Sequence, residues 1–335
     1  MANQATRERG RTIPSSVFAG ILYLIMFAIY AANAPSALTL SGITDLLNNT
    51  VVLALAAAGL TFVILTAELD LSSVGVIAVT NVVVATVSTS IAGGAFVSLI
   101  LVSLIGTLVG VINGGLVAYL GLQSLACTLG TMIICQGIAL LILAAPGGEV
   151  ASFIMNRLTD TVFGVLPVSA VILLVVIALW LLCRRTHFGI AIYAVGTDAT
   201  ASRLSGINVR RTKLVAFGLA GLAYALAGYM LSAQTGTGDP RVSNAFLLYV
   251  FAAVAIGGTS LMGGRGGLIG SVVGAGILTV MQKMLFAMGI AEFYTNIFNG
   301  IIMVLAILFG SLSRMVSRRQ SLATRKPAAG GYAAN

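Results

Sequence analysis

Long apolar runs, separated by short polar or glycine-containing segments, recur along the whole 335-residue chain. A run of roughly 20 apolar residues is long enough to cross the hydrocarbon core of a bilayer as an α-helix. The pattern predicts ten spans, and the first and eighth are short enough that we expect them to be tilted, broken or extended. The predicted spans are residues 17–32, 50–66, 73–92, 96–120, 124–145, 166–183, 213–232, 246–262, 268–288 and 296–312.

Composition supports the same fold class. Apolar residues make up 59% of the chain and charged residues only 8%, whereas about a quarter of the residues in a soluble domain are charged. The alternating ten-residue segments of a membrane β-barrel are missing. We therefore expect an all-α integral membrane protein with about ten transmembrane helices. Its parts would be an N-terminal segment (1–16), a transmembrane domain (17–312) that includes an inner segment (184–212), and a basic, disordered tail (313–335).

The lysines and arginines predict the orientation, because basic residues gather on the cytoplasmic side of a membrane protein. With the N-terminus inside, 15 of the 18 lie in inner segments, only Arg157 and Arg241 lie outside, and Lys283 falls within the ninth span. The even number of spans then places both termini in the cytoplasm. We interpret the net charge of +9 as a topology signal aided by attraction to anionic lipid, and we expect no nucleic-acid partner.

Two breaks interrupt the apolar pattern, at 66–73 and at 257–267. Non-helical backbone is tolerated at membrane depth only where protein or a water-filled cavity surrounds it. The breaks occupy comparable places, between spans two and three and between spans eight and nine, which favours an internal repeat with broken helices. Glycines of the second break are expected to allow close backbone packing or positive φ; they are Gly257, Gly258, Gly263, Gly264, Gly266 and Gly267.

The inner segment 184–212 contains signals for a short helix. Thr197 or Asp198 can cap its N-terminus, and Gly206 can supply the left-handed residue that ends it. A helix of about two turns is marginal alone in water and needs a partner surface. That surface could belong to its own bundle or to another subunit, and the residues alone leave both possibilities open.

Catalytic chemistry is not expected in this chain. The sequence has no Gly-Lys-Ser/Thr of a phosphate-binding loop. A single histidine and nine acidic residues offer no candidate for a catalytic triad or a metal cluster. We therefore predict that the chain is not an enzyme and itself binds no metal and no cofactor.

The glycine break and the inner segment resemble a known family, the permease subunits of bacterial monosaccharide ABC importers of the ribose and xylose type. Residues 257–266, followed by 270–275, are similar to the family's Gly-Gly-Thr-Ser-Leu-x-Gly-Gly-x-Gly signature. Residues 193–196 with 201–208 resemble its cytoplasmic coupling segment. Further matches are Asp70-Leu71-Ser72, Asn113-Gly114 and Thr128-Leu129-Gly130, so the resemblance covers roughly residues 45–310.

The resemblance implies a division of labour. A separate ATPase subunit would bind ATP, a periplasmic or extracellular binding protein would deliver sugar, and a second permease copy or homologue would complete the pathway in the bacterial inner (plasma) membrane. The glycine break would belong to the transmission region and not to a sugar filter. The residues implied to couple to the ATPase are Gly196, Asp198, Ala199, Ala201, Arg203, Leu204 and Gly206.

Departures from the family pattern leave the sugar open. Glu68 stands where many ribose-type members have glycine, Gln136 stands where arginine is frequent, and residues 124–127 replace a more usual Pro-x-Phe-Ile stretch. All of these lie near the presumed pathway. Polar residues inside a bundle more often support helix packing, but we take five as substrate-pathway candidates: Glu68, Asp70, Asn113, Gln136 and Asn299.

Two other functions are weighed against the importer permease. An ion-gradient-driven secondary transporter of a small polar solute would need intramembrane acids or a sodium site, and only Glu68, Asp70 and Lys283 are available for one. A channel or a non-transporting membrane scaffold is the second rival.

Overall fold

The computed structural model describes residues 15–242, 244–290, 294, 297, 300 and 301. Nine apolar helices match the first nine predicted spans, while most of the tenth, 296–312, lies outside the described residues, as do residues 1–14 and the tail 313–335. The nine are α1 (Ser15–Asn33), α2 (Leu40–Leu65), α3 (Ser73–Val87), α4 (Gly94–Ala118), α5 (Ser124–Ile142), α7 (Val168–Arg184), α10 (Val209–Thr235), α11 (Asn244–Ile256) and α12 (Leu268–Ala287).

The structure supports part of the predicted set of ten spans. Within the described residues, five helices are long and apolar enough to cross a membrane, namely α2, α4, α5, α10 and α12. A sixth span is possible if α7 and α8 (His187–Thr197), which meet at 78°, count as one broken span. Helix α3 and the described parts of α1 and α11, Ala19–Asn33 and Ala245–Ile256, are apolar but shorter, so ten spanning helices are not confirmed.

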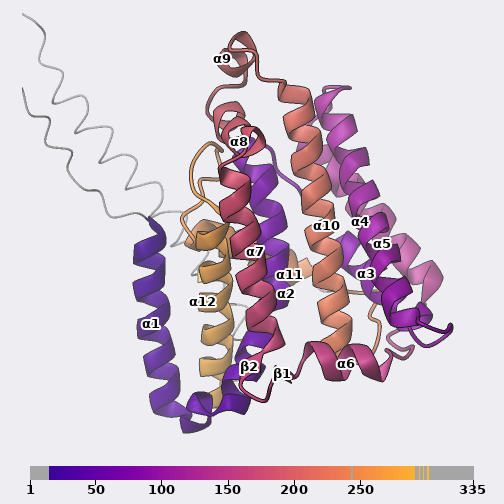
Figure 1. Cartoon of the computed structure of the whole chain (residues 1–335), viewed down its shortest axis with the longest axis vertical. Coiled ribbons are helices and arrows are strands. Elements are labelled where there is room, and N and C mark those ends of the chain that lie inside the picture. Colours follow the sequence, from indigo (N-terminus) through magenta and orange to yellow (C-terminus); the bar gives the residue numbers. More distant parts are fainter. Residues whose placement is uncertain (1–14, 243, 291–293, 295–296, 298–299, 302–335) are drawn as a thin grey trace, which may run out of the picture.

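Short elements close the two ends of the bundle. A 3₁₀ helix, η1 (Pro35–Leu38), joins α1 to α2, and α6 (Ser152–Leu158) precedes a small hairpin. The hairpin pairs β1 (Thr161–Val162) with β2 (Leu166–Pro167) antiparallel, with Val162 opposite Leu166. Helix α9 (Ala199–Leu204) forms the opposite end of the molecule (Figure 1). We call these the α6 end and the α9 end.

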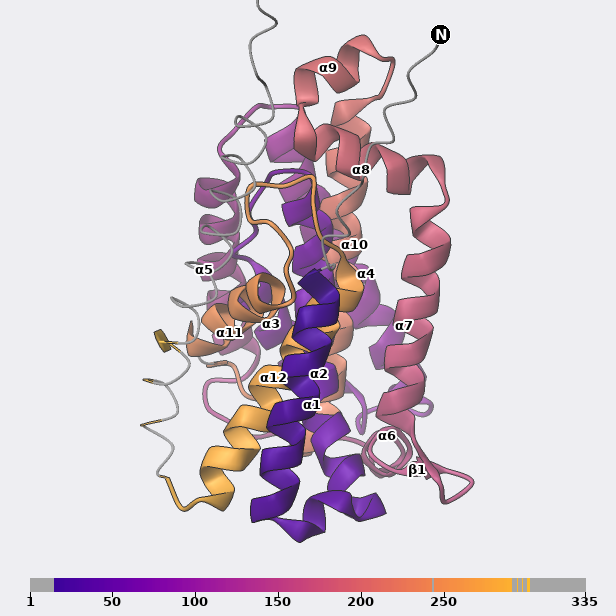
Figure 2. The same ribbon diagram turned by 90° about the vertical axis from the view of Figure 1, so that its left-hand side faces the viewer.

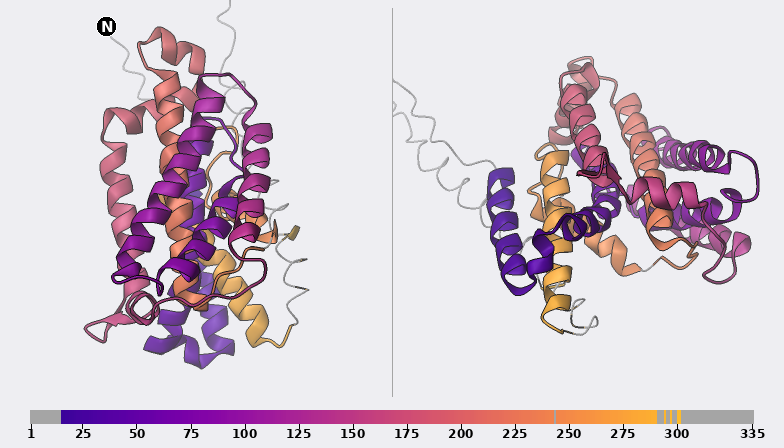
Figure 3. Two further views of the ribbon diagram at one scale, coloured as in Figure 1. Left: turned by 90° about the vertical axis from the view of Figure 1, so that its right-hand side faces the viewer. Right: turned by 60° about the horizontal axis from the view of Figure 1, so that its bottom comes forward.

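Helix α2 lies at the centre of the bundle. It packs against α10, α12, α11 and α7, and α1 and α5 lie toward opposite edges of the molecule (Figures 1 and 3). Side chains exposed on α4 and α5, such as Leu104, Ile112 and Ile134, are apolar, as expected for surfaces that face lipid.

Small residues bring α4 and α10 close together. A Cβ atom on Gly106 would lie 2.3 Å from the carbonyl oxygen of Gly221, and one on Gly221 would lie 2.0 Å from the carbonyl oxygen of Gly106. Membrane helices commonly pack through such positions, because backbones can then touch without intervening side chains. This contact fixes α10, whose two ends form part of both sites described below.

Candidate functional site

The sequence folds the predicted inner segment into an arm of two helices, residues 187–206, which we call the α8–α9 arm. Thr186 caps the start of helix α8, because its hydroxyl oxygen accepts the amide of Gly189 at 3.2 Å. Asp198 caps the start of helix α9, because its carboxylate accepts the amides of Thr200 and Ala201 at 2.8 and 2.9 Å. Gly206 follows α9 with φ +84°, so the predicted short helix with its two caps is confirmed.

The arm projects beyond the long helices (Figures 1 and 2). Leu204 at its tip is 85% exposed, and the neighbouring Ala201 and Arg203 are also exposed, while Ser202 faces inward. The tip of the arm therefore exposes a leucine beside a cation on a capped helix. The residues expected to couple to an ATPase therefore fall into two groups. Ala201, Arg203 and Leu204 are exposed at the tip, whereas Gly196 is buried and Asp198 caps the helix.

Gly196 joins the arm to the body of the molecule. A Cβ atom there would lie 1.9 Å from the carbonyl oxygen of Leu65, at the end of α2, and 2.6 Å from the amide nitrogen of Gly264. The Gly264 amide itself donates to the Leu65 carbonyl oxygen at 3.2 Å. Three segments that are far apart in sequence therefore meet through their backbones, and a side chain at this point would separate them.

The third of these segments is the glycine loop, residues 257–267, which connects α11 to α12 and extends toward the α9 end (Figure 2). The Tyr193 hydroxyl of α8 donates to the Gly266 carbonyl oxygen at 2.8 Å, and the Arg184 guanidinium lies 5.9 Å from the centre of the Tyr193 ring. Inside the loop, the Gly267 amide donates to the Thr259 hydroxyl at 3.1 Å. The loop is thus fixed to the arm by a defined hydrogen bond.

Backbone conformation explains why this loop is rich in glycine. A positive φ is unfavourable for residues with a Cβ atom but not for glycine. Gly257 is required for a different reason, namely close packing. A Cβ atom there would lie 2.3 Å from the Gly270 carbonyl group. The glycines with positive φ are Gly258, Gly263, Gly264 and Gly266, at +82°, +85°, +67° and +112°.

The other break, residues 66–72 between α2 and α3, contains a buried carboxylate. Asp70 is 1% exposed, and one of its oxygens accepts the Ser72 amide at 2.9 Å and the Ser72 hydroxyl at 2.6 Å. Asn113 of α4, which is fully buried, donates to the Ser72 hydroxyl at 3.2 Å and accepts from Thr131 of α5 at 2.6 Å. The structure therefore brings Asp70 and Asn113 into one polar network.

Burial raises the pKa of the Asp70 carboxyl, while its hydrogen bonds from Ser72 lower it. Helix α5 also provides a hydrogen-bond partner for the non-helical backbone of the break, because the Leu71 amide donates to the Thr128 hydroxyl at 3.0 Å. Sequence reasoning had no role for Thr131 or Ser124, although Ser124 accepts the Leu69 amide at 3.3 Å. The first turns of α5 carry a hydroxyl residue about once per turn. This repeat in the sequence could have predicted the contact between α5 and the break.

The structure describes two of the remaining pathway candidates, Glu68 and Gln136. Glu68 forms an ion pair with Lys213 at the start of α10. Gln136 is half-buried on α5, and Asn299 lies outside the described residues. Of the five candidates, the structure links Asp70 and Asn113 through Ser72.

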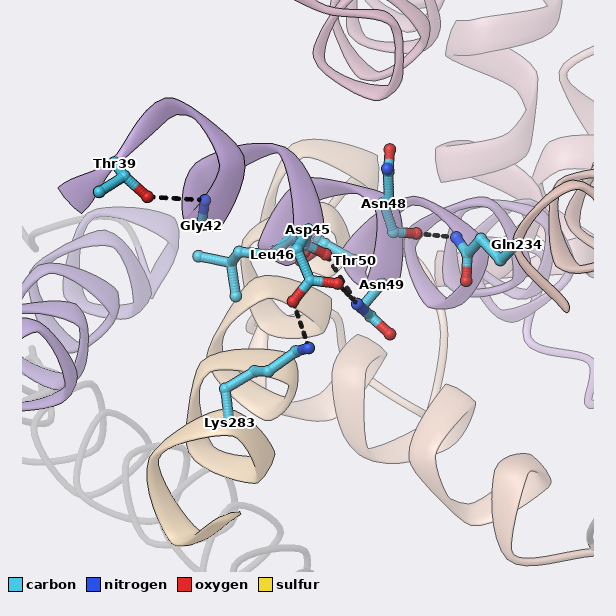
Figure 4. A network of polar contacts seen from close by, with 9 residues as sticks. All are labelled: Thr39, Gly42, Asp45, Leu46, Asn48, Asn49, Thr50, Gln234 and Lys283. Atoms are coloured by element: carbon cyan, nitrogen blue, oxygen red, sulfur yellow. Dashed lines mark hydrogen bonds and ion pairs between the residues drawn. The ribbon is translucent and has the colours of Figure 1, made fainter. Parts of the chain in front are cut away.

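A cavity of about 650 Å³ opens elsewhere, at the α6 end between α2, α10, α11 and α12. The sequence analysis did not predict this cavity, although isolated polar residues within the apolar spans could have indicated it. Figure 4 shows the polar contacts at its edge, where Lys283 of α12 pairs with Asp45 of α2 and Gln234 of α10 donates to the Asn48 carbonyl oxygen. Its polar lining consists of Asn49, Gln234, Tyr249, Thr279, Gln282 and Lys283.

Metal chemistry has no candidate in the described part of the chain, where no group of three or more His, Cys, Asp or Glu side chains is placed to hold an ion. The structure thus contains a buried polar network around Asp70, a projecting arm joined to a glycine loop, and a cavity of mixed polar and apolar lining between helices that include α11 and α12, which the loop connects.

Comparison with known proteins identifies the family. Residues 42–307 match the model described as branched-chain amino acid transport system, permease component. The ribose import permease protein RbsC of Haemophilus influenzae is 34% identical over 294 residues, which cover 86% of this chain and 90% of the relative. The probable ABC transporter permease protein YphD of Escherichia coli is 33% identical and covers 91% of each chain. The xylose transport system permease protein XylH of Escherichia coli is 29% identical and covers 89% and 91%.

No solved structure matches the chain. The family model covers most of the residues, and the relatives match this chain over nearly their whole length. The expected resemblance to ribose and xylose permeases is therefore confirmed. The chain belongs to the family of membrane permease components that this model describes.

Proposed function

We propose that this chain is the membrane-spanning subunit of an ATP-driven importer that moves a monosaccharide into the cytoplasm by alternating access. ATP would be bound and hydrolysed by a separate subunit, sugar would be delivered by a periplasmic or extracellular binding protein, and a second permease copy or homologue would complete the pathway. The proposal includes ten spans with an internal repeat and both termini in the cytoplasm, which places the α9 end inside and the α6 end outside.

One observation carries the proposal, namely the continuous connection from the exposed arm to the cavity. Leu204 and Arg203 form a surface on which another subunit can dock. The arm is bonded to the glycine loop through Tyr193 and Gly266, and that loop leads directly into α11 and α12, which line the cavity. A displacement of the arm would therefore reach the cavity through rigid helices and a bonded loop, and alternating access requires a two-state element of this kind.

The relatives support the substrate class, because two of them are described as permeases for ribose and for xylose. In the network around Asp70, Ser72 donates twice to one carboxylate oxygen, and the other oxygen has no partner among the described residues; Lys213 pairs with Glu68. In this proposal Asp70 and Asn113 hold the break between α2 and α3, while Glu68 and Gln136 remain candidates for contact with the moving sugar.

Uptake by proteoliposomes tests the proposal. The chain is reconstituted with its ATPase, and the binding protein loaded with radiolabelled sugar is added outside. We expect accumulation that requires ATP, the ATPase and the binding protein together. Gradient-driven uptake by this chain alone would overturn the proposal and favour a secondary transporter, whereas downhill flux without any energy source would indicate a channel.

A further inference from the structure

The cavity at the α6 end has unused hydrogen-bonding capacity. The side-chain amide nitrogen of Asn49 donates to the Asp45 backbone and carboxylate oxygens at 2.7 and 3.0 Å, which leaves its carbonyl oxygen as an acceptor. The amide nitrogen of Gln234 donates to the Asn48 carbonyl oxygen, so its own oxygen also stays available. Figure 4 shows both amide oxygens turned away from these partners.

Gln282 supplies the complementary donors. It lies half-buried on α12 and lines the cavity, and no hydrogen bond links its side chain to any other described residue. A primary amide offers two donors and one acceptor. Between them, Asn49, Gln234 and Gln282 can therefore accept from and donate to a ligand that carries several hydroxyl groups.

The charge at the cavity is balanced. Lys283 is the charged residue of the described lining, and its ammonium pairs with the Asp45 carboxylate. A free amino acid would need one unpaired cation for its carboxylate and one unpaired anion for its ammonium group, because burying an unpaired charge is costly. The described lining residues provide neither, so their electrostatics favour a neutral ligand.

Aromatic side chains complete the lining. Phe246 and Tyr249 of α11 and Phe286 of α12 border the cavity. A sugar ring has an apolar face as well as hydroxyl groups, and binding sites typically combine aromatic surface with a few placed polar groups. The volume of about 650 Å³ also lies within the range of roughly 300–1,000 Å³ that small-molecule sites have.

We propose that this cavity is a binding station for a neutral polyhydroxylated ligand of monosaccharide size, with Gln282 as a contact residue. The inference rests on the proposed function for the substrate class, but it adds the place and the residues. It also favours a sugar over the branched-chain amino acid that the name of the family model contains.

Thiol protection tests binding directly. The variant Gln282→Cys is reconstituted in nanodiscs and labelled with a small maleimide, with the wild-type chain as the background for Cys127, Cys135 and Cys183. We expect D-ribose or D-xylose at millimolar concentration to slow labelling of the introduced thiol, and L-leucine to leave it unchanged. The matched control is Gln123→Cys, because Gln123 is exposed beside α5 and its side chain caps no helix. Sugar should not protect this thiol.

Uptake in the complete importer supplies the second readout. Gln282→Leu should lower sugar uptake about fivefold to tenfold, the effect of losing one hydrogen bond, while complex assembly stays intact and Gln123→Leu transports at the wild-type rate. Protection by leucine alone, protection by no solute, or wild-type uptake by Gln282→Leu would each overturn the inference. If sugar protects the thiol but wild-type uptake runs on an ion gradient, the proposed ATP-driven function fails and the binding station stands.

Discussion

Asp70 shows what a single buried polar residue does in this fold. Its carboxylate oxygen accepts two hydrogen bonds from Ser72, and Ser72 in turn accepts from Asn113. Removing an acceptor leaves buried donors without a partner, which costs about 1–3 kcal/mol. The effect on the protein should therefore be structural and not confined to transport.

We expect Asp70→Ala to lower the free energy of unfolding by about 1–3 kcal/mol, measured as a lower thermal midpoint in detergent. Asp70→Asn keeps an acceptor oxygen and should lose less. Asp160→Ala is the matched control, because Asp160 also accepts a backbone amide, from Thr161 at 2.7 Å, but is exposed. Equal small losses at both aspartates would contradict the buried network.

Single residues were predictable from the sequence where their chemistry is local. The caps at Asp198 and Gly206 depend only on neighbours within a few positions, so their pattern is visible in the chain. The bond from Thr131 to Asn113 and the bond from Gln234 to Asn48 depend on how whole helices rotate and pack. The spacing of residues along the sequence does not reveal this rotation, which is why the cavity was missed.

At the element scale, two predicted boundaries were displaced for identifiable reasons. Helix α2 begins at Leu40 and not near residue 50, because the Thr39 hydroxyl caps it by accepting the Gly42 amide at 3.1 Å. Its first turns carry Thr44, Asp45, Asn48 and Asn49 and so escape a hydropathy pattern. Helix α11 ends at Ile256 and not at residue 262, because the glycine loop adopts backbone angles that a helix excludes.

The glycine loop should respond unequally to alanine. At Gly266, φ is +112° and a Cβ atom would lie 2.4 Å from the Thr259 Cα, so Gly266→Ala should cost about 1–3 kcal/mol in strain and lower both thermal stability and uptake. Gly267 has extended backbone with φ 161°, and its nearest contact would be the Tyr193 hydroxyl at 3.2 Å. Gly267→Ala should therefore be the milder variant. Tolerance of alanine at Gly263, Gly264 and Gly266 alike would argue for a plain connecting loop.

Helix α9 should act as a separable coupling element. Gly206 has φ +84° with open space around its Cβ position, so Gly206→Val strains only the backbone that ends α9. We expect this variant to uncouple ATP hydrolysis from sugar uptake, with both rates measured in the same vesicles. Gly93→Val is the control, because Gly93 has φ +70° and equally open space but precedes α4 at the other end. Unchanged assembly and uptake with Gly206→Val would refute the coupling role.

At the scale of the whole molecule, the two breaks are neighbours. Gly263 of one approaches Ala67 of the other, where a Cβ atom would lie 2.8 Å from the Ala67 Cα. The sequence showed that both segments had to be sheltered by protein, since lipid cannot satisfy open backbone. It could not show that they shelter each other, because this depends on how α2, α8 and α12 are arranged.

The same scale shows why apolar composition alone does not count the spanning helices. Helices α3 and α11 are as apolar as a membrane span but have 15 and 13 residues, which is shorter than the roughly 20 that a bilayer requires. All of α3 from Ser73 to Ala85 is buried. A helix enclosed by other helices needs an apolar surface but not the length of the bilayer, and composition alone does not separate these two requirements.

The central position of α2 has a consequence for how the protein is made. Of its most apolar 18-residue window, 78% is buried inside the protein, compared with 22% for α4 and α5. A nascent segment enters the bilayer through its own hydropathy and associates with its neighbours afterwards. The leucines and valines of α2 therefore meet lipid during biogenesis and protein thereafter, while the alanines at 54 and 56–58 suit the final close packing. Substitutions in α2 can thus fail at insertion or at assembly, two steps that translocation assays and folding assays distinguish.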